Sequence, residues 1–185
     1  MSKVAEVAII DAVLAELRTG AKAVTNPALT VHNSEWQPDG KPPPNSPDLY
    51  VSVDEDGMMS GGDAAQGELK EVAKINVWIS IRAGSIAPDR RAEIMRRNSQ
   101  PLSAMERKII DAIHGNQTIR AAANASLAAG DAIFHNPLYY AGRVKTEIKD
   151  SSWASEGDNT EVSGWVVRRL PFIGMRRVYY IGSVL

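Results

Sequence analysis

The chain has 185 residues, of which 44% are hydrophobic and 23% are charged, and this composition is typical of one soluble globular domain. Its formal net charge of −1 argues against a global electrostatic attraction to nucleic acid or to an anionic membrane. Because the sequence has no cysteine, disulfides, thiolate nucleophiles and cysteine zinc sites are excluded, and a reducing cytoplasm is the expected compartment. We expect no signal peptide and no membrane-spanning segment.

An amphipathic helix is predicted from Ser2 to about Arg18, and Gly20 is expected to end it. Its apolar residues recur at steps of three and four and form one stripe: Val7, Ile10, Leu14 and Leu17. The favoured interpretation is a helix that lies on a sheet, and the alternative is a helix that binds a partner.

The next part of the chain predicts strands separated by long connections. Short strands are expected at 29–32 and 49–54, and Asp56-Gly57 is a turn signal. The segment 33–48 contains five prolines and is therefore neither a helix nor a central strand. Residues 60–67 are small, polar and rich in glycine, which predicts a mobile tip.

The main strand is predicted over residues 71–82. Its sequence alternates strictly, and one face of it is apolar and rich in β-branched residues: Ala73, Ile75, Val77, Ile79 and Ile81. This pattern predicts a strand with one face on a core, paired with the strand at 49–54 in a long hairpin.

Helices are expected again after this strand, over 89–97 and from Ser103 onward. Ser103 and Glu106 have the spacing of a capping box, and Gly115 stands where a left-handed residue ends a helix. Residues 118–129 are rich in alanine, and their sequence does not decide between helix and strand.

The last third predicts strands over 139–149, 162–170 and 175–184, with Pro171 and Gly174 around a tight connection. The order of helices and strands favours an α+β fold, with a mostly antiparallel sheet and helices packed on one face. We expect residues 1–185 to form a single domain.

Three segments are long for loops of a compact domain: 33–48, 55–70 and 150–161. Ordering a loop costs roughly 1–2 kcal/mol per residue in backbone entropy, and a neighbouring subunit could offset that cost. We therefore predict that these segments are interaction loops, with four apolar anchors at a subunit or partner interface: Trp36, Met58, Met59 and Trp153. The alternative is that Trp36 and Trp153 fold back on their own subunit.

The sequence carries no catalytic motif, and we assign no catalytic, cofactor-binding or metal-binding residue. The three histidines, His32, His114 and His135, do not have a metal-ligand spacing. His114 lies near the end of a predicted helix, where a structural role is favoured. The acidic run 54–57 does not continue with the spacing of a calcium loop.

Arginine occurs in four doublets, at 90–91, 96–97, 168–169 and 176–177. Adjacent strand residues point to opposite faces, so each strand doublet places one arginine on each side of the sheet. We expect Arg168, Arg169, Arg176 and Arg177 to form salt bridges at an interface. A surface that faces DNA and plain solvated charge are the alternatives.

The element order and two stretches of sequence resemble the tail terminator (tail completion) proteins of tailed bacteriophages. The stretches are INVWISIRAGSIAPDRRAEIMRRN followed by LSAMERKIIDAIHG, and the terminal RVYYIGSVL. The resemblance covers most of the chain by layout and rests on pattern, without a diagnostic motif. The proline-rich segment and residues 150–161 are longer than in the smaller members.

The resemblance implies a homohexameric ring at the head-proximal end of a phage tail tube, which stops tube polymerisation and joins the tail to the head connector. The implied partners are other copies of the chain, the major tail tube protein and the head connector or stopper protein. DNA would pass through the lumen without sequence-specific binding. No catalysis, cofactor or membrane is implied, and the location would be the virion neck after assembly in the bacterial cytoplasm.

Two other classes of function stay open from the sequence. One is another phage neck or minor tail protein. The other is a small soluble adaptor, or an enzyme with a cleft that the sequence does not reveal.

Overall fold

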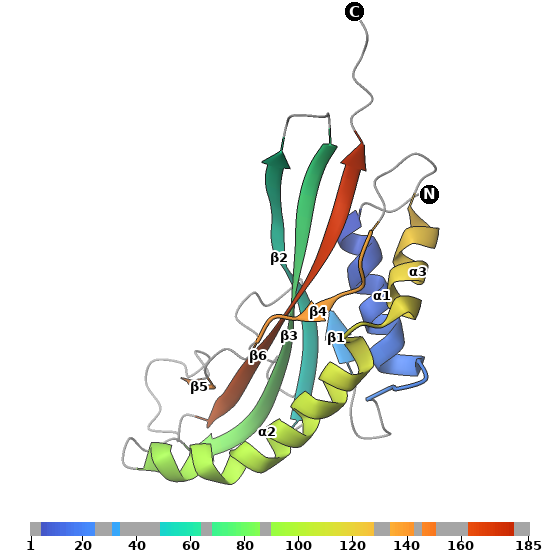
Figure 1. Ribbon diagram of the computed structural model, residues 1–185. Coiled ribbons are helices and arrows are strands. Elements are labelled where there is room, and N and C mark those ends of the chain that lie inside the picture. The colour runs from blue at the N-terminus through green and yellow to red at the C-terminus, as the bar shows by residue number, and fades with distance from the viewer. Residues whose placement is uncertain are drawn as a thin grey trace, which may run out of the picture.

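The computed structural model describes residues 5–24, 31–33, 49–63, 68–85, 90–127, 134–142, 146–150 and 163–179. This part of the chain is α+β, with helices gathered on one side of a mostly antiparallel sheet (Figure 1). The fold class predicted from the sequence is therefore confirmed.

The sheet is built around three long strands that run in the order β2-β3-β6. Shorter strands extend its edges: β1 pairs with β2 in parallel, while β4 and β5 both pair with β6 in antiparallel. β2–β3 and β3–β6 are also antiparallel. The strands are β1 (Val31–Asn33), β2 (Leu49–Asp63), β3 (Glu68–Ser85), β4 (Tyr139–Tyr140), β5 (Glu147–Asp150) and β6 (Ser163–Tyr179).

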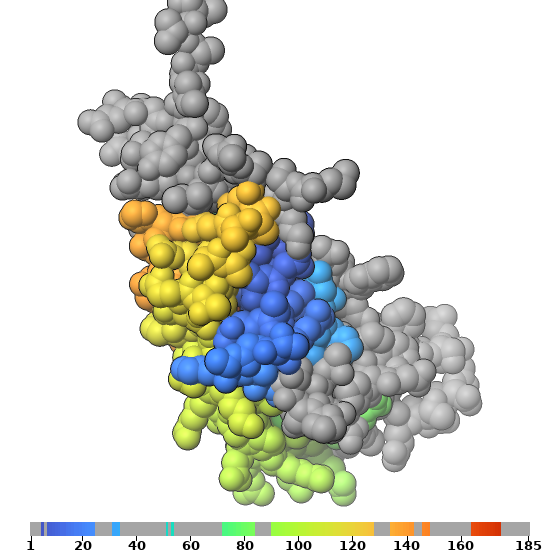
Figure 2. Space-filling view, turned by 90° about the vertical axis from the view of Figure 1, so that its right-hand side faces the viewer, coloured from blue at the N-terminus to red at the C-terminus, as the bar shows by residue number. Residues whose placement is uncertain are grey.

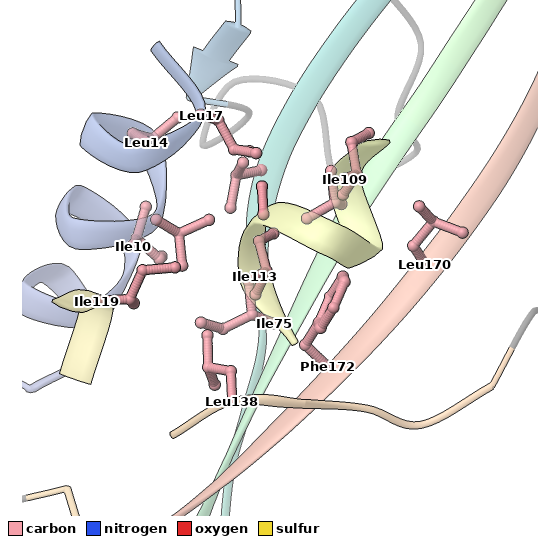
Figure 3. Close-up of a cluster of buried hydrophobic side chains, with 14 of the residues drawn as sticks. Ile10, Leu14, Leu17, Ile75, Ile109, Ile113, Ile119, Leu138, Leu170 and Phe172 are labelled. Atoms are coloured by element: carbon pink, nitrogen blue, oxygen red, sulfur yellow. The ribbon is translucent and has the colours of Figure 1, made fainter. Parts of the chain in front are cut away.

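Three helices cover one face of this sheet: α1 (Ala5–Thr19), α2 (Arg91–Ile113) and α3 (Gln117–Ser126). Figure 2 shows them side by side, with α1 in blue and α3 in yellow above the yellow-green α2. The hydrophobic core lies between the helices and the sheet, and Figure 3 shows how its side chains converge from α1, α2, α3, β3 and β6. Its labelled members are Ile10, Leu14, Leu17, Ile75, Ile109, Ile113, Ile119, Leu138, Leu170 and Phe172.

The alternation predicted for the main strand is present in β3. Ala73, Ile75, Val77 and Ile79 are at most 3% exposed and belong to the core. Of the intervening positions, Lys74 and Trp78 are half-buried, whereas the polar Asn76 and Ser80 are buried, at 3% and 0% exposed. The long hairpin of β2 and β3 is also present, with Val51 opposite Ile79 and Val53 opposite Val77.

The apolar stripe predicted for the first helix is partly wrong. Ile10, Leu14 and Leu17 are buried as expected, but Val7 is 38% exposed. The buried surface is instead wider on another side of α1, where Ala8, Ile9, Ala12 and Val13 are buried. The reason is that α1 packs against α3 as well as against the sheet.

The prediction of a loop at 55–70, with a turn at Asp56-Gly57, is wrong for the residues that the structure describes. β2 continues through both residues to Asp63, and Glu68 to Lys70 already belong to β3. The pairing shifts register between Glu55 and Met58, which is a β-bulge. A bulge accommodates an extra residue and keeps the two strands paired. Asp56-Gly57 therefore forms a bulge within β2 and not the turn that the sequence predicted.

The predicted break between 162–170 and 175–184 is also wrong, because β6 runs without interruption through Pro171 and Gly174. Proline cannot donate a ladder hydrogen bond. The Pro171 carbonyl nevertheless accepts one from the backbone N–H of Ala141, at 2.9 Å. Pro171 therefore lies in β6 between the residues that pair with β5 and those that pair with β4, where no strand partner on that edge needs its missing N–H.

The predictions for residues 89–149 need three corrections, and one choice that the sequence left open is decided. The segments expected at 89–97 and from Ser103 are one helix, α2, which has Pro101 inside it and bends in Figure 1. Ser103 and Glu106 therefore lie within a helix and form no capping box. Of residues 118–129, left undecided by the sequence, 118–126 are helical and belong to α3. The strand expected at 139–149 is divided into β4 and β5.

Candidate functional site

The most unusual feature of the described chain is the length of its three central strands, which we call the blade: β2, β3 and β6. They have 15, 18 and 17 residues, whereas a strand in a globular protein averages about 5–6 residues. At about 3.3 Å per residue, the blade is roughly 50–60 Å long. In Figure 1 the three strands rise side by side from the level of α2 to a tip beyond the ends of α1 and α3.

The registers place three segments at the same level of the blade, which we call the blade tip: 58–63, 68–73 and 174–179. Met58 is opposite Ala73, and Ala73 is opposite Gly174. At the far end, Asp63 is opposite Glu68, and Glu68 is opposite Tyr179. The tip is thus a three-stranded ribbon of matched strands rather than a set of loops.

Both outer edges of the blade tip are open within the part of the chain that the structure describes. β1 pairs with β2 at residues 51–53, below the tip. On the other side, β4 reaches no further than Ile173 and β5 pairs below it, at residues 164–167. An edge strand presents backbone N–H and C=O groups that can pair with another strand, so each of these edges is a candidate for strand addition.

Four of the predicted interface residues lie in the blade tip. Met58 and Met59 are opposite Ala73 and Val72 of β3. Arg176 and Arg177 are opposite Glu71 and Lys70. Their backbone positions therefore bring both pairs to the same end of the molecule, on the two opposite edge strands. Trp36 and Trp153 lie outside the described residues.

Arg168 occupies a different place, inside the protomer beneath α2. It is 4% exposed, and its guanidinium Nη1 lies 2.6 Å from a carboxylate oxygen of Glu106. It also donates hydrogen bonds to the hydroxyls of Ser103, at 3.2 Å, and Thr146, at 3.0 Å. Tyr140 donates its hydroxyl to the same Glu106 at 3.4 Å. The carboxylate that pairs with Arg168 thus belongs to the same chain, so this cluster ties α2 to the sheet.

Arg169 points to the opposite face of β6, where two arginine–tryptophan pairs cross from strand to strand. The guanidinium of Arg169 lies 5.9 Å from the ring centre of Trp78, its register partner in β3. In the same way Arg82 lies 4.9 Å from the ring centre of Trp165. Cation–π pairs of this kind add roughly 0.5–2 kcal/mol each, and here they bind β3 to β6.

The side chain of His114 has a structural role, as the sequence favoured. His114 accepts a hydrogen bond through Nδ1 from the backbone N–H of Tyr140 at 3.1 Å, which joins the end of α2 to β4. Burial, together with the nearby Arg18 guanidinium, lowers the pKa of His32 below its usual value of 6.5. Arg18 itself donates from Nε to the carbonyl of Val31 at 2.9 Å.

A shallow, open hollow of about 330 Å³ lies beside the end of α2, lined by Lys22, Arg107, Ile110, Asp111 and His114. Lys22 and Asp111 form an exposed ion pair across it, at 2.9 Å. In the residues that can be placed, no group of three or more histidine or acidic side chains has a geometry that could hold a metal ion. Nor does any helix in these ranges combine the length and apolarity required to span a membrane.

Comparisons with known proteins place few constraints on this chain. No model of a protein family matches it, and no curated protein matches its sequence. Among solved structures, it is similar to a chain of the "Virion of native gene transfer agent (GTA) particle", with 17% identity over 94% of this chain and 92% of that one. The TM-score of 0.34 is too low to establish a shared fold or function.

Proposed function

We propose that this protein is a structural component of a tailed-phage particle that forms a ring at the head-proximal end of the tail tube. It would end tube polymerisation there and join the tail to the head connector. Its partners would be other copies of itself, the major tail tube protein and the connector or stopper protein. DNA would pass through the ring without sequence-specific contacts, and no catalytic step is involved.

The observation that carries this proposal is the blade. The core between the helices and the sheet reaches the base of the blade tip at Ala73, and the backbone pairing of the three strands continues beyond it to Asp63, Glu68 and Tyr179. A long ribbon whose two edges are open among the described strands is suited to contact a neighbouring subunit on each side. A ring has the matching symmetry, because each copy presents one surface to one neighbour and a different surface to the other.

The sequence resemblance to tail terminators gives the proposal its specific role. Within the described residues, the quoted stretches fall on β3, on α2 and, at 177–179, on the end of β6, which are the parts that build the blade and its support. The resemblance and the blade both support a protein that assembles with other copies of itself. The first is a property of the sequence pattern and the second of the strand geometry.

The test uses the full-length chain and polymerising tail tube protein from the same phage. Native mass spectrometry and negative-stain microscopy of the purified chain should reveal closed rings, alone or at one end of each tube. Added during tube polymerisation, the chain should stop growth and shorten the tubes in proportion to its concentration. A chain that stays monomeric and leaves the length of the tubes unchanged would refute the proposal.

A further inference from the structure

The two outer strands of the blade carry opposite charge. β2 contains Asp54, Glu55, Asp56 and Asp63 and no lysine or arginine. β6 contains Arg168, Arg169, Arg176 and Arg177 and no aspartate or glutamate. Arg168 pairs with Glu106 and Arg169 stacks on Trp78, so the doublet at the blade tip carries the argument that follows.

The direction of the strands restricts how two copies can meet. β2 and β6 are both antiparallel to β3, so they run in the same direction. Copies related by rotation about an axis roughly along the blade would bring β6 of one beside β2 of the next, as parallel neighbours. A twofold dimer would instead pair β2 with β2, or β6 with β6, in antiparallel.

Charge then selects between these two arrangements. A twofold pair would bring acidic strand against acidic strand or basic against basic, and like charges on facing strands are destabilising. The rotational arrangement brings the acidic edge of one copy to the basic edge of the next. Charged residues on an edge strand commonly prevent it from pairing with another strand. When the two edges of one protein carry opposite charge, only the pairing of two acidic edges or of two basic edges is prevented.

We propose that the outer edge of β2 in one copy pairs with the outer edge of β6 in the next copy, in parallel, and that this pairing closes the ring. In this arrangement Arg176 and Arg177 lie beside Glu55 and Asp56 of the neighbour, which follow the β2 residues paired with β1, at 51–53, and come just before the blade tip. The β6 strand is then shifted by about four residues from its level in its own blade, as strands are staggered when a sheet closes. The inference rests on the proposed ring and names its interface.

The test is a charge exchange between two variants of the full-length chain. One variant carries Glu55→Arg and Asp56→Arg, so that both of its edges are basic. The other carries Arg176→Glu and Arg177→Glu, so that both of its edges are acidic. Each variant alone should lose the rings seen by native mass spectrometry. Mixed in equal amounts, they should recover rings that contain the two variants in a one-to-one ratio, because only unlike neighbours attract.

The matched control reverses another arginine doublet, Arg96→Glu with Arg97→Glu, whose side chains are exposed and belong to α2 and not to either edge strand. It should assemble like the wild type. Thermal unfolding by circular dichroism checks that each variant folds. If a reversal variant does not fold, Arg176→Gln with Arg177→Gln replaces it and should weaken rings without removing the fold.

The outcomes separate this inference from the proposed function. If the wild type forms rings and both reversal variants also form them, or if the mixture of folded variants does not recover them, the edge pairing is overturned and the ring function stands. If the wild type forms no ring, alone or on tail tubes, the proposed function falls and this interface falls with it.

Discussion

Arg168 and Glu106 form a buried ion pair, with 2.6 Å between guanidinium nitrogen and carboxylate oxygen and side-chain exposures of 5% and 14%. Removing one partner of such a pair leaves an uncompensated buried charge, which typically costs about 3–5 kcal/mol. We therefore expect Glu106→Gln to lower the free energy of unfolding by about 3 kcal/mol, measured by chemical denaturation. The exposed pair offers the control: Asp111→Asn, next to Lys22, should change it by less than about 1 kcal/mol.

A double replacement separates the charge from the packing. Well-packed apolar side chains often substitute for a buried ion pair with little loss of stability. Arg168→Met combined with Glu106→Leu should accordingly be more stable than Glu106→Gln alone. If the double variant is the least stable, the pair itself contributes net stability and the desolvation argument is wrong for this site.

The sequence predicted the parts of the fold that rest on periodicity. Alternation in β3 identified Ile75, Val77 and Ile79 as core, and the three- to four-residue stripe identified Ile10, Leu14 and Leu17. Both patterns report which side of an isolated element is apolar. The exposed Val7 shows the limit, because which neighbour a helix packs against is a tertiary property.

Local breaking signals misled the sequence analysis wherever long-range pairing outweighed them. Pro101 lies inside α2, Pro171 inside β6, and Asp56-Gly57 inside β2. Each is unfavourable in an isolated element, but hydrogen bonding or packing on both sides holds the element together. The blade could not be predicted for this reason, since the two apparent breaks in its strands, Asp56-Gly57 and Pro171, had to be overridden by contacts between strands distant in sequence. The pairing of Arg168 with Glu106 could not be predicted either, because it depends on how α2 packs against β6.

Asn116 caps the beginning of α3. Its side-chain oxygen accepts hydrogen bonds from the backbone N–H groups of Thr118, at 2.8 Å, and Ile119, at 3.4 Å. Asn116→Ala leaves these donors without that acceptor and should lower the free energy of unfolding by about 1 kcal/mol. Asn116→Asp keeps an acceptor at the same place and should retain most of the stability. If both variants lose the same free energy of unfolding, the capping hydrogen bonds are not the source of the lost stability.

Gly115 connects α2 to this cap with a backbone φ of +69°, which is the left-handed region. A Cβ added there would meet no atom within 4 Å, so the effect of a substitution is conformational and not steric. Gly115→Ala should therefore destabilise the fold by about 1 kcal/mol, and Gly115→Asn by less, because asparagine adopts this region more readily. Thermal unfolding of the wild type and the two variants under the same conditions measures the order of their stabilities. A Gly115→Asn variant less stable than Gly115→Ala would contradict the conformational account.

The stacking of Arg82 on Trp165 can be isolated by a double-mutant cycle. The two are register partners on β3 and β6, with the guanidinium 4.9 Å from the ring centre. Arg82→Met and Trp165→Leu, singly and together, should give a coupling free energy of about 0.5–2 kcal/mol. The cycle cancels the other contacts of each side chain. A coupling indistinguishable from zero would mean that the two side chains are only neighbours.

His32 should make the stability of the fold depend on pH. Burial and Arg18 lower its pKa in the folded state below the ordinary 6.5, so the unfolded chain binds more protons between the lowered pKa and that value. Stability therefore rises with pH across this window, and it is lost as the pH falls from 6.5 through the folded-state pKa. Urea denaturation across this range should show the slope in the wild type and a flatter profile in His32→Gln, which cannot take up a proton. Arg18→Gln removes one of the two causes, so its slope should lie between those of the other two chains. If His32→Gln keeps the full slope, the proton uptake belongs to another group.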